Sequence, residues 1–333
     1  MVCAAWAGCD GSALLPAPPG LLDAMAPAGF PAGTVASAAP PDDPLTEEKA
    51  RLGRRLFNEP ALSRTGEVSC ASCHQQRYGF SDPRPVSAGV DGALGTRNAP
   101  ALGNLAWGQS FFWDGRAKTL EEQAGQPIEN PVEMGLKVDD AVARLAADAD
   151  YVRDFSAAFG APPTAVSLRQ ALASFVRTLV SGGSRYDQFL AGDASALDDA
   201  AARGKDVFFG TRGRCFHCHP EGALTNEGFF NNGSYAPEGD RGRQVVTGRA
   251  GDLGKFKVPG LRNVAVTAPY MHDGSLATLE EVIDQYDRGG RGDPSTDPQI
   301  TPLSLAPDEK ADLLAFLKAL TDERFLVDAR FRP

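Results

Sequence analysis

The sequence predicts a mainly α protein composed of two similar halves, and two observations support this fold class. Apolar residues recur at three- and four-residue spacing in several segments, whereas the alternating pattern of a strand is nearly absent. In addition, residues 113–122 resemble residues 272–281, and residues 98–102 resemble residues 257–261. Because sequence blocks that recur in the same order indicate a repeated structural unit, we expect an internal duplication.

The expected helices begin and end at recognisable residues. Thr119 and Thr278 are good N-caps, and each is followed two residues later by a Glu that favours the helix dipole. Two further helices are expected to end in similar residues, at 53–57 and 204–209. A short strand-like pair lies at residues 244–247. Other helices are expected at residues 46–57, 139–159 with a break near 149–151, 167–180 and 308–320.

Composition excludes several classes of protein. The 333 residues are 42% hydrophobic and 23% charged, which is typical of a globular chain and not of a disordered or fibrous one. No uninterrupted apolar run approaches the ~20 residues that a membrane-spanning helix needs. The net charge of -10 gives no support to nucleic-acid binding, which usually needs a basic face. It is compatible with brief docking on a charged partner.

Four of the six cysteines form two copies of the motif C-x-x-C-H, the attachment signature of c-type haem. Each thiol can add to a haem vinyl group, and the next His is then carried under the iron as a ligand. A zinc half-site or a redox dithiol are the alternatives. Zinc needs four ligands, and neither alternative explains a His after each pair in a chain with four His. We therefore predict two covalent haems, held by Cys70, Cys73 and His74 and by Cys215, Cys218 and His219.

Each half is expected to contain a helix, a haem loop, a long loop, an Asp-Gly turn and a second helix. The predicted fold is thus two cytochrome c-like domains, in which the haems supply much of each core. The predicted divisions are a signal remnant and Ala-Pro-rich tether at residues 1–45, an N-terminal haem domain at 46–195 and a C-terminal haem domain at 196–333.

Covalent haem also sets the expected compartment. Bacterial c-type cytochromes are assembled outside the cytoplasmic membrane, which implies a periplasmic or externally anchored protein. Residues 1–9 have a short apolar stretch and lack the basic region of a complete secretory signal. Residues 6–9 form a poor version of a lipoprotein cleavage box, so a lipid anchor at Cys9 stays open. Residues 10–45 are rich in Ala, Pro and Gly and are expected to be a mobile tether.

The combination of motifs resembles the bacterial dihaem cytochrome c peroxidase family, including its MauG-like branch. The resemblance covers about residues 46 to 325. It rests on both C-x-x-C-H motifs and on F-W-D-G-R-A, N-P-V-E-M and T-A-P-Y-M-H-D-G. It implies that hydrogen peroxide is reduced at the N-terminal haem with electrons passed through the C-terminal haem, and that a calcium ion lies between the domains.

The resemblance also assigns roles to residues. Trp113 is expected to lie between the haems and couple them electronically, Gln123 to line the distal pocket, and Glu133 to be the distal acid–base group. From the residues alone the ordinary interpretation would be preferred in each case: Trp113 as a core residue, Gln123 as a helix-surface residue and Glu133 as a solvated loop charge. The matched spacing of the three residues favours the functional interpretation. The residues implied for the calcium site are Asn98 and the backbone carbonyls of Thr267 and Pro269.

Peroxide chemistry gives these roles a physical basis. Peroxide must lose a proton at the oxygen that binds iron and regain it at the far oxygen, and a carboxylate above the iron can carry that proton. Burial beside a haem would raise the pKa of Glu133 toward a useful range. Gln123 could hold peroxide or water without adding charge, while the redox chemistry belongs to the haem.

Axial ligation departs from the ordinary peroxidases of this family. Residues 75–98 contain no His, so the N-terminal iron is expected to have His74 as its only protein ligand. At the C-terminal iron, Tyr286 occupies the position of the usual Met, as in the MauG-like branch. Met271 and His272 remain alternative ligands. The remaining histidine, His217, is expected to face outward.

These inferences lead to one functional hypothesis and two alternatives. The main hypothesis is a dihaem c-type peroxidase that uses hydrogen peroxide and a small redox protein donor, a cytochrome c or a copper protein. The first alternative is a maturase that oxidises Trp residues of a partner protein at the same site. The second is a non-catalytic dihaem electron carrier, against which an open haem and Glu133 argue.

Overall fold

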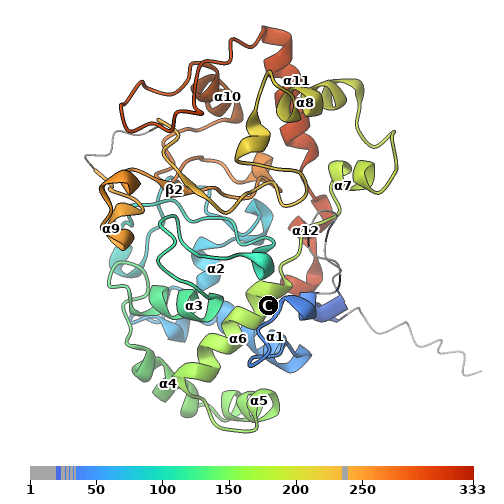
Figure 1. Ribbon diagram of the computed structural model, residues 1–333. Coiled ribbons are helices and arrows are strands. Elements are labelled where there is room, and N and C mark those ends of the chain that lie inside the picture. The colour runs from blue at the N-terminus through green and yellow to red at the C-terminus, as the bar shows by residue number, and fades with distance from the viewer. Residues whose placement is uncertain (1–19, 24–26, 28–29, 31–32, 34, 235–238) are drawn as a thin grey trace, which may run out of the picture.

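The computed structural model describes residues 20–23, 27, 30, 33, 35–234 and 239–333. Helices make up most of the regular secondary structure of these residues (Figure 1). Cys3 and Cys9 lie outside the described residues. No helix in the described ranges is long and apolar enough to cross a membrane. The helices are α1 (Glu47–Phe57), α2 (Cys70–Cys73), α3 (Leu120–Glu129), α4 (Val138–Ala146), α5 (Ala149–Phe159), α6 (Ala165–Thr178), α7 (Arg185–Leu190), α8 (Asp199–Phe209), α9 (Gln244–Thr247), α10 (Leu279–Asp287), α11 (Pro307–Ala319) and α12 (Glu323–Val327).

The single two-stranded sheet of the described chain pairs β1 (Phe229–Phe230) with antiparallel β2 (Phe256–Lys257). The prediction of a mainly α protein is therefore confirmed. The expected break in the helix at residues 139–159 is present, but it lies at residues 147–148, between α4 and α5, and residues 149–151 already belong to α5. The side chains of Thr119 and Thr278 accept hydrogen bonds from backbone amides at the starts of α3 and α10, as expected for N-caps.

The strand-like pair expected at residues 244–247 is wrong, because these residues form the single turn α9. The amide of Gly248 donates to the carbonyl of Gln244 at 2.8 Å, and Gly248 adopts a left-handed φ of 70° that ends the helix. The two valines of this turn are exposed and have no partner strand, so their β propensity is overridden by the local turn.

The duplication appears as two equivalent helix pairs, α1 with α6 and α8 with α11, which lie in the lower and upper parts of Figure 1. One glycine in each pair permits the close approach of the helices. A Cβ atom on Gly53 would lie 1.8 Å from the carbonyl oxygen of Ala171, and one on Gly204 would lie 1.9 Å from that of Asp312. The repeated Gly in the sequence therefore marks the same helix crossing in both halves.

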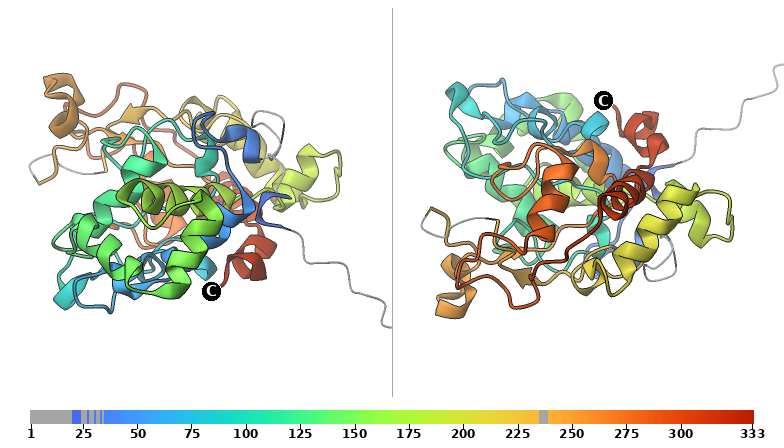
Figure 2. Two further views of the ribbon diagram at one scale, coloured as in Figure 1. Left: turned by 90° about the horizontal axis from the view of Figure 1, so that it is seen from below. Right: turned by 90° about the horizontal axis from the view of Figure 1, so that it is seen from above.

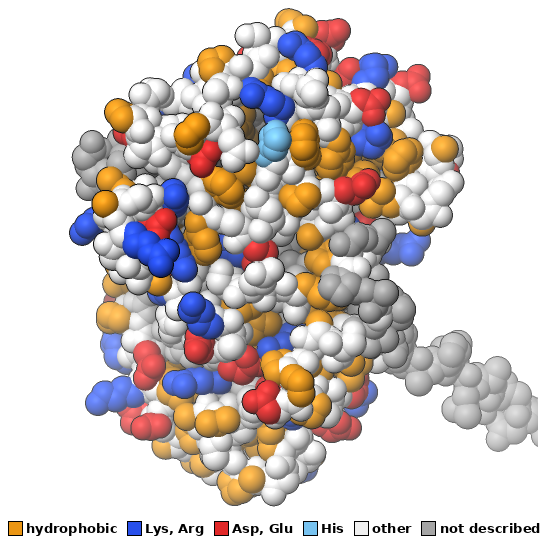
Figure 3. Space-filling view, viewed as in Figure 1, with side chains coloured by type: hydrophobic (Ala, Val, Ile, Leu, Met, Phe, Trp, Pro, Cys, Tyr) orange, Lys and Arg blue, Asp and Glu red, His pale blue; other side chains and the backbone are white. Residues whose placement is uncertain are grey.

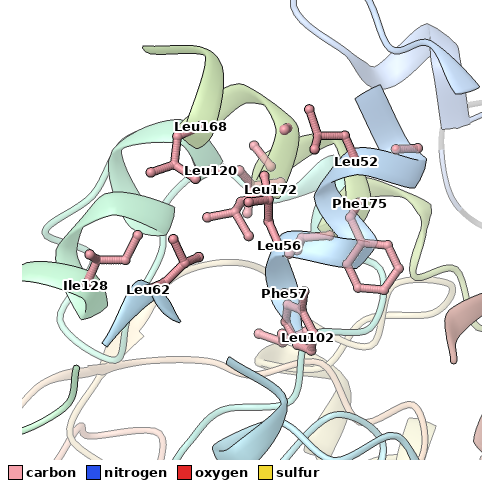
Figure 4. Close-up of a cluster of buried hydrophobic side chains, with 14 of the residues drawn as sticks. Leu52, Leu56, Phe57, Leu62, Leu102, Leu120, Ile128, Leu168, Leu172 and Phe175 are labelled. Carbon is pink, nitrogen blue, oxygen red and sulfur yellow. The ribbon is translucent and has the colours of Figure 1, made fainter. Parts of the chain in front are cut away.

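Two hydrophobic clusters form the core. The first lies among α1, α3 and α6 (Figure 4) and includes Leu56, Leu120 and Phe175. The second lies around α8, α10 and α11 and includes Phe208 and Phe316. Each cluster lies beside one of the two C-x-x-C-H motifs, so each half positions its own motif on a packed helical support.

Both ends of the described chain pack on the first cluster. Phe325 and Phe331, which follow the second half in sequence, belong to the first cluster. So do Leu21 and Val35, and the amide of Leu21 donates to the Glu47 carboxylate at 3.1 Å. Leu21 and Val35 therefore anchor the described parts of this Ala-, Pro- and Gly-rich segment to the first cluster, and the mobility of the tether as a whole stays a prediction. The domain division near residue 195 stays a prediction.

Candidate functional site

A cavity of about 1680 Å³ opens between the two halves. It is larger than the ~300–1,000 Å³ of an ordinary small-molecule pocket. All the residues predicted for the site line this one cavity: Cys70, Cys73, His74, Asn98, Trp113, Gln123, Glu133, Cys215, Cys218, His219, Thr267, Pro269 and Tyr286. The structure therefore brings together residues that are far apart in the sequence.

The His of each C-x-x-C-H motif is held in the same way. Nδ1 of His74 lies 2.9 Å from the carbonyl oxygen of Phe80, and Nδ1 of His219 lies 2.7 Å from that of Leu224. These contacts fix each ring and leave Nε2 as the nitrogen available to a haem iron. Burial lowers the pKa of His74, and it lowers the pKa of His219 to about 4. Both rings are thus neutral, as metal ligation requires.

The two cysteines of each motif lie on one short helical turn. Cys70 and Cys73 bound α2, and Cys215 begins a 3₁₀ turn at Cys215–His217. Burial raises the pKa of Cys70 and of Cys215 to about 12, so the free thiols are neutral. In the described part of the chain, no cluster of three or more His, Cys, Asp or Glu is suited to hold a metal ion. Each pair is followed by a His whose Nδ1 is engaged and whose Nε2 is available to an iron, an arrangement that fits covalent haem.

Glu133 lies near the first motif, and its charge acts on both thiols of Cys70 and Cys73. Burial raises the pKa of Glu133, although a hydrogen bond and a nearby guanidinium act to lower it. The hydrogen bond comes from Nδ2 of Asn130 to Oε1 at 2.5 Å. The guanidinium belongs to Arg116. The sequence analysis missed both residues, although Asn130 is part of N-P-V-E-M.

Local structure explains how Glu133 is held in place. Helix α3 carries Gln123 into the cavity wall and ends at the turn that bears Glu133. The amide of Val90 donates to the carbonyl of Glu133 at 2.9 Å. A Cβ atom on Gly89 would lie 2.4 Å from that carbonyl oxygen, so only glycine lets the loop approach so closely.

Trp113 lies where the two halves meet. Its Nε1 donates to the carbonyl of Asn98 at 2.8 Å, and its own carbonyl accepts from the amide of Lys257 at 2.7 Å. The amide of Asn98 in turn donates to the carbonyl of His272 at 2.7 Å. Trp113 and His272 are equivalent positions of the repeat, as are Asn98 and Lys257. The interface is thus an exchange of equivalent hydrogen bonds between the halves.

An ion-pair network beside Trp113 joins the halves. The guanidinium of Arg97 donates to Asp114 at 2.6 Å and to both carboxylate oxygens of Asp240 at 2.6 and 2.9 Å. Burial acts to raise the pKa of Asp240, but the hydrogen bonds from Arg97 and the Gly242 amide hold it below its usual value. Asp240 was missed because it lies outside the repeated blocks and has no motif of its own.

At the second motif, Tyr286 and Met271 lie side by side. Nδ2 of Asn232 lies 3.1 Å from the phenol oxygen of Tyr286 and 3.3 Å from the sulfur of Met271. The Asn232 amide is oriented because its oxygen accepts from the backbone and hydroxyl of Ser234. Burial raises the pKa of Tyr286 to about 12, although the hydrogen bond from Asn232 acts to lower it. Asn232 is a further residue that the sequence analysis missed.

The other histidines have distinct environments. His272 is buried and stacks on Phe256 with ring centres 3.6 Å apart. Burial lowers the pKa of His272 to about 4. This packing agrees with a structural role for His272. His217 is exposed, as the sequence predicts.

The residues implied for calcium supply suitable oxygen ligands. Asn98 is buried, and its Nδ2 donates to the carbonyls of Arg84 and Pro85 at 3.1 and 3.2 Å. Within the described ranges no group donates a hydrogen bond to Oδ1 of Asn98, which leaves that oxygen available for a cation. Thr267 and Pro269 line the same cavity. Amide and carbonyl oxygens are the ligands that calcium prefers. The calcium site stays a prediction.

A duplicated helical fold with one C-x-x-C-H motif in each half, both opening into one cavity, defines the class of di-haem c-type proteins. Within this class, the chain belongs to the di-haem cytochrome c peroxidase family. The family model described as "Di-haem cytochrome c peroxidase" matches residues 47–195. Membership implies two haem c groups and a peroxidase-type oxidoreductase, and it argues against a non-catalytic electron carrier.

Relatives under two different names support this assignment. The chain is 42% identical to methylamine utilization protein MauG of Methylorubrum extorquens over 85% of this chain and 81% of that protein. It is 36% identical to cytochrome c551 peroxidase of Nitrosomonas europaea over 84% and 82%, respectively. A solved structure of a MauG-like protein associated with microbial copper homeostasis superposes with a TM-score of 0.83 at 41% identity, over 88% of this chain and 95% of that one. The predicted pair of cytochrome c-like domains is therefore confirmed.

Proposed function

We propose that the protein reduces hydrogen peroxide at its N-terminal haem with electrons passed through its C-terminal haem. The observation that supports this direction is the placement of Glu133 and Gln123 in the cavity wall, with the charge of Glu133 acting on Cys70 and Cys73 of the first motif. The second motif instead lies near Tyr286 and Met271. The charge of Asp297 acts on Cys218, but among the described residues Asp297 does not line the cavity as Glu133 does. The two halves thus offer different chemistry.

The residues of the first half have separate tasks in this reaction. When bound, the haem supplies the iron that binds peroxide and takes up its oxidising equivalents. Glu133 takes a proton from the near oxygen of peroxide and returns it to the far oxygen, where water leaves. Its raised pKa brings the carboxyl closer to the pH at which it can do both. Asn130 holds the carboxylate, and Gln123 lines the cavity, where its amide would hydrogen-bond peroxide or water.

Trp113 and the second half complete the reaction by delivering electrons. The indole of Trp113 donates to the Asn98 carbonyl within its own half, and the Trp113 carbonyl accepts from the Lys257 amide of the other half, so the residue is held where the halves meet. A fixed indole is suited to pass an electron or a hole without reorganisation. The reaction consumes two electrons and two protons for each peroxide and releases two waters. We further propose a periplasmic location and a calcium ion at Asn98, Thr267 and Pro269, with Cys9 as a lipid anchor left open.

A maturase that oxidises Trp residues of a partner protein is the second candidate function. It is favoured by the 42% identity to a MauG protein and by Tyr286, which is placed at the second motif where an anionic ligand stabilises the ferric state. In that reaction the partner protein, and not a small redox protein, supplies the two electrons to peroxide. The same residues in the first half would handle the protons.

Steady-state turnover separates the two functions. The holoprotein is mixed with peroxide and a reduced small redox protein, and oxidation of that protein is followed by absorbance. A peroxidase completes many turnovers and oxidises two molecules of the redox protein for each peroxide consumed. If turnover stops near one equivalent while added peroxide accumulates, the peroxidase proposal is wrong. Peroxide-dependent mass changes in Trp-containing peptides of a partner then support the maturase.

A further inference from the structure

A small basic and apolar surface lies on α9, and we call it the α9 patch. It consists of Arg241, Val245, Val246 and Arg249. The side chains of Val245 and Val246 are 69% and 38% exposed and are adjacent in sequence. Two neighbouring exposed valines on a single turn make no contribution to either hydrophobic cluster. Exposed valines occur elsewhere on the described surface, but these two are adjacent and lie between arginines, which is an arrangement suited to contact with a partner.

The charge of the α9 patch is opposite to that of the whole protein. Arg241 and Arg249 are exposed. The side chain of Arg241 donates to the Gln244 amide oxygen at 2.9 Å, and among the described residues no carboxylate forms an ion pair within 4 Å of Arg241 or Arg249. Asp252 lies near Arg249 but is paired with Lys255, so the basic residues still outnumber it. Figure 3 shows several Lys and Arg side chains in the region of α9, with an acidic side chain among them. On a protein of net charge -10, this surface attracts an acidic partner that most of the molecule repels.

The α9 patch is joined to the site between the halves. Arg241 and Val245 themselves line the cavity. Just before α9, the guanidinium of Arg243 donates to the carbonyls of Asp114 and Gly115 at 2.7 and 2.8 Å, directly after Trp113 in sequence. A protein bound to the α9 patch would thus lie at the rim of the cavity and against the segment that carries Trp113.

We infer that the α9 patch is the docking surface for the electron donor, a small redox protein whose contact face is acidic with an apolar centre. This inference rests on the proposed function, because it names the partner of that reaction. Exposed apolar residues surrounded by charge are the usual arrangement of a transient interface, and the charges increase the association rate. Each encounter transfers one electron from the donor, so two encounters supply the two electrons that one peroxide consumes.

The test compares two protein donors, one small-molecule donor and three variants of the holoprotein. The donors are reduced plant plastocyanin, which has an acidic docking face, and reduced horse-heart cytochrome c, which has a basic one. The variants are Arg241→Glu with Arg249→Glu, Val245→Asp and the control Arg324→Glu. Arg324 is also exposed, but it lies on α12, well apart from α9 in both views of Figure 2. Hydroquinone serves as a small uncharged donor.

We expect wild type to oxidise plastocyanin faster than cytochrome c, at a rate that falls as salt is added. The double charge reversal should lower the plastocyanin rate about 10-fold or more at low salt, the scale of electrostatic steering. It should also flatten the salt dependence. Val245→Asp should lower the rate as well, while Arg324→Glu and all hydroquinone rates should stay near wild type.

Three results would overturn the inference: no salt-sensitive oxidation of plastocyanin, a preference for cytochrome c, or a double variant that behaves like Arg324→Glu. Failure of the proposed function looks different, because wild type would then fail to turn over peroxide with hydroquinone. Normal hydroquinone turnover with unaffected plastocyanin rates rejects the α9 patch alone.

Discussion

The indole nitrogen of Trp113 donates a 2.8 Å hydrogen bond to the backbone carbonyl of Asn98. This contact joins the residue expected to couple the haems to the residue expected to bind calcium. Asn98 also donates its own amide to His272 in the other half. The orientation of the indole therefore depends on the arrangement of both halves and on the loop that carries Asn98.

Replacement of Trp113 should slow communication between the haems. In Trp113→Phe the hydrogen bond to Asn98 and the easily oxidised indole are both lost. We expect unchanged haem spectra and a several-fold slower oxidation of the C-terminal haem after peroxide is added, measured by stopped-flow absorbance. Trp107→Phe is the matched control, because Trp107 also lines the cavity but packs on Phe30. If the C-terminal haem is oxidised at equal rates in both variants, Trp113 contributes only packing and does not couple the haems.

Removal of the carboxylate at residue 133 should impair proton transfer. Glu133→Gln should lower peroxide reactivity by ~10²-fold or more, the usual scale for a positioned acid–base group. Haem content should not change. Glu129→Gln on the exposed end of α3 is the control and should behave as wild type. Near-normal reactivity of Glu133→Gln would remove this residue from the mechanism.

The same carboxyl should give the reaction a pH dependence. Burial raises the pKa of Glu133 above that of an ordinary Glu. Only the deprotonated form can accept the proton of peroxide, so reactivity should rise as pH increases through this raised pKa and fall below it. The pH profile of the bimolecular rate constant tests this, and the limb should be absent from Glu133→Gln. If the rate constant of the wild-type protein instead rose at the pKa of a solvent-exposed Glu, this would contradict the effect of burial.

Axial ligation should be visible in spectra of the resting ferric protein. With no His at residues 75–98, we expect one high-spin and one low-spin haem. Tyr286→Phe should alter only the low-spin signal in electron paramagnetic resonance. Tyr270→Phe is the control, because Tyr270 lines the cavity but donates to the carbonyl of Val264 at 3.0 Å. A low-spin signal that instead responds to Met271→Leu would make Met271 the ligand.

The close helix crossing at Gly53 should make that position intolerant of a side chain. Gly53→Ala would place Cβ 1.8 Å from the Ala171 carbonyl, so the helices must separate. We expect a loss of about 1–3 kcal/mol or more in the free energy of unfolding, as for other overpacked cores. Guanidinium denaturation measures it. Gly251→Ala, where a Cβ would meet nothing within 4 Å, should be near neutral. Equal stabilities would show that the helix pair adjusts freely.

Local features of the fold could be predicted from the sequence. Helix periodicity, the N-caps Thr119 and Thr278 and the repeated blocks all depend on neighbouring residues, and each was found as expected. Turn α9 could not be predicted, because its valines favour strands and only the left-handed Gly248 reveals the turn. The packing of Leu21 and Val35 could not be predicted either, because the few apolar residues of the segment 10–45 show no periodicity.

The candidate site could be predicted only where a motif marks it. The C-x-x-C-H motifs identify their own ligands, and the family resemblance supplied Trp113, Gln123 and Glu133. Asp240 and Asn232 could not be found in this way. Each acts through one long-range contact, Asp240 with Arg97 and Asn232 with Tyr286. Such contacts are set by the packing of the halves and leave no local pattern.

The packing of Phe325 and Phe331 on the first cluster has a consequence for how the chain matures. Phe325 and Phe331 follow the second half in sequence, so the core of the first half cannot be completed before the second half has been synthesised. Loss of the final ten residues would remove Phe325 and Phe331 and should loosen the surroundings of His74 before those of His219. The segment that carries Phe325 and Phe331 thus completes the hydrophobic core of the half that is synthesised first.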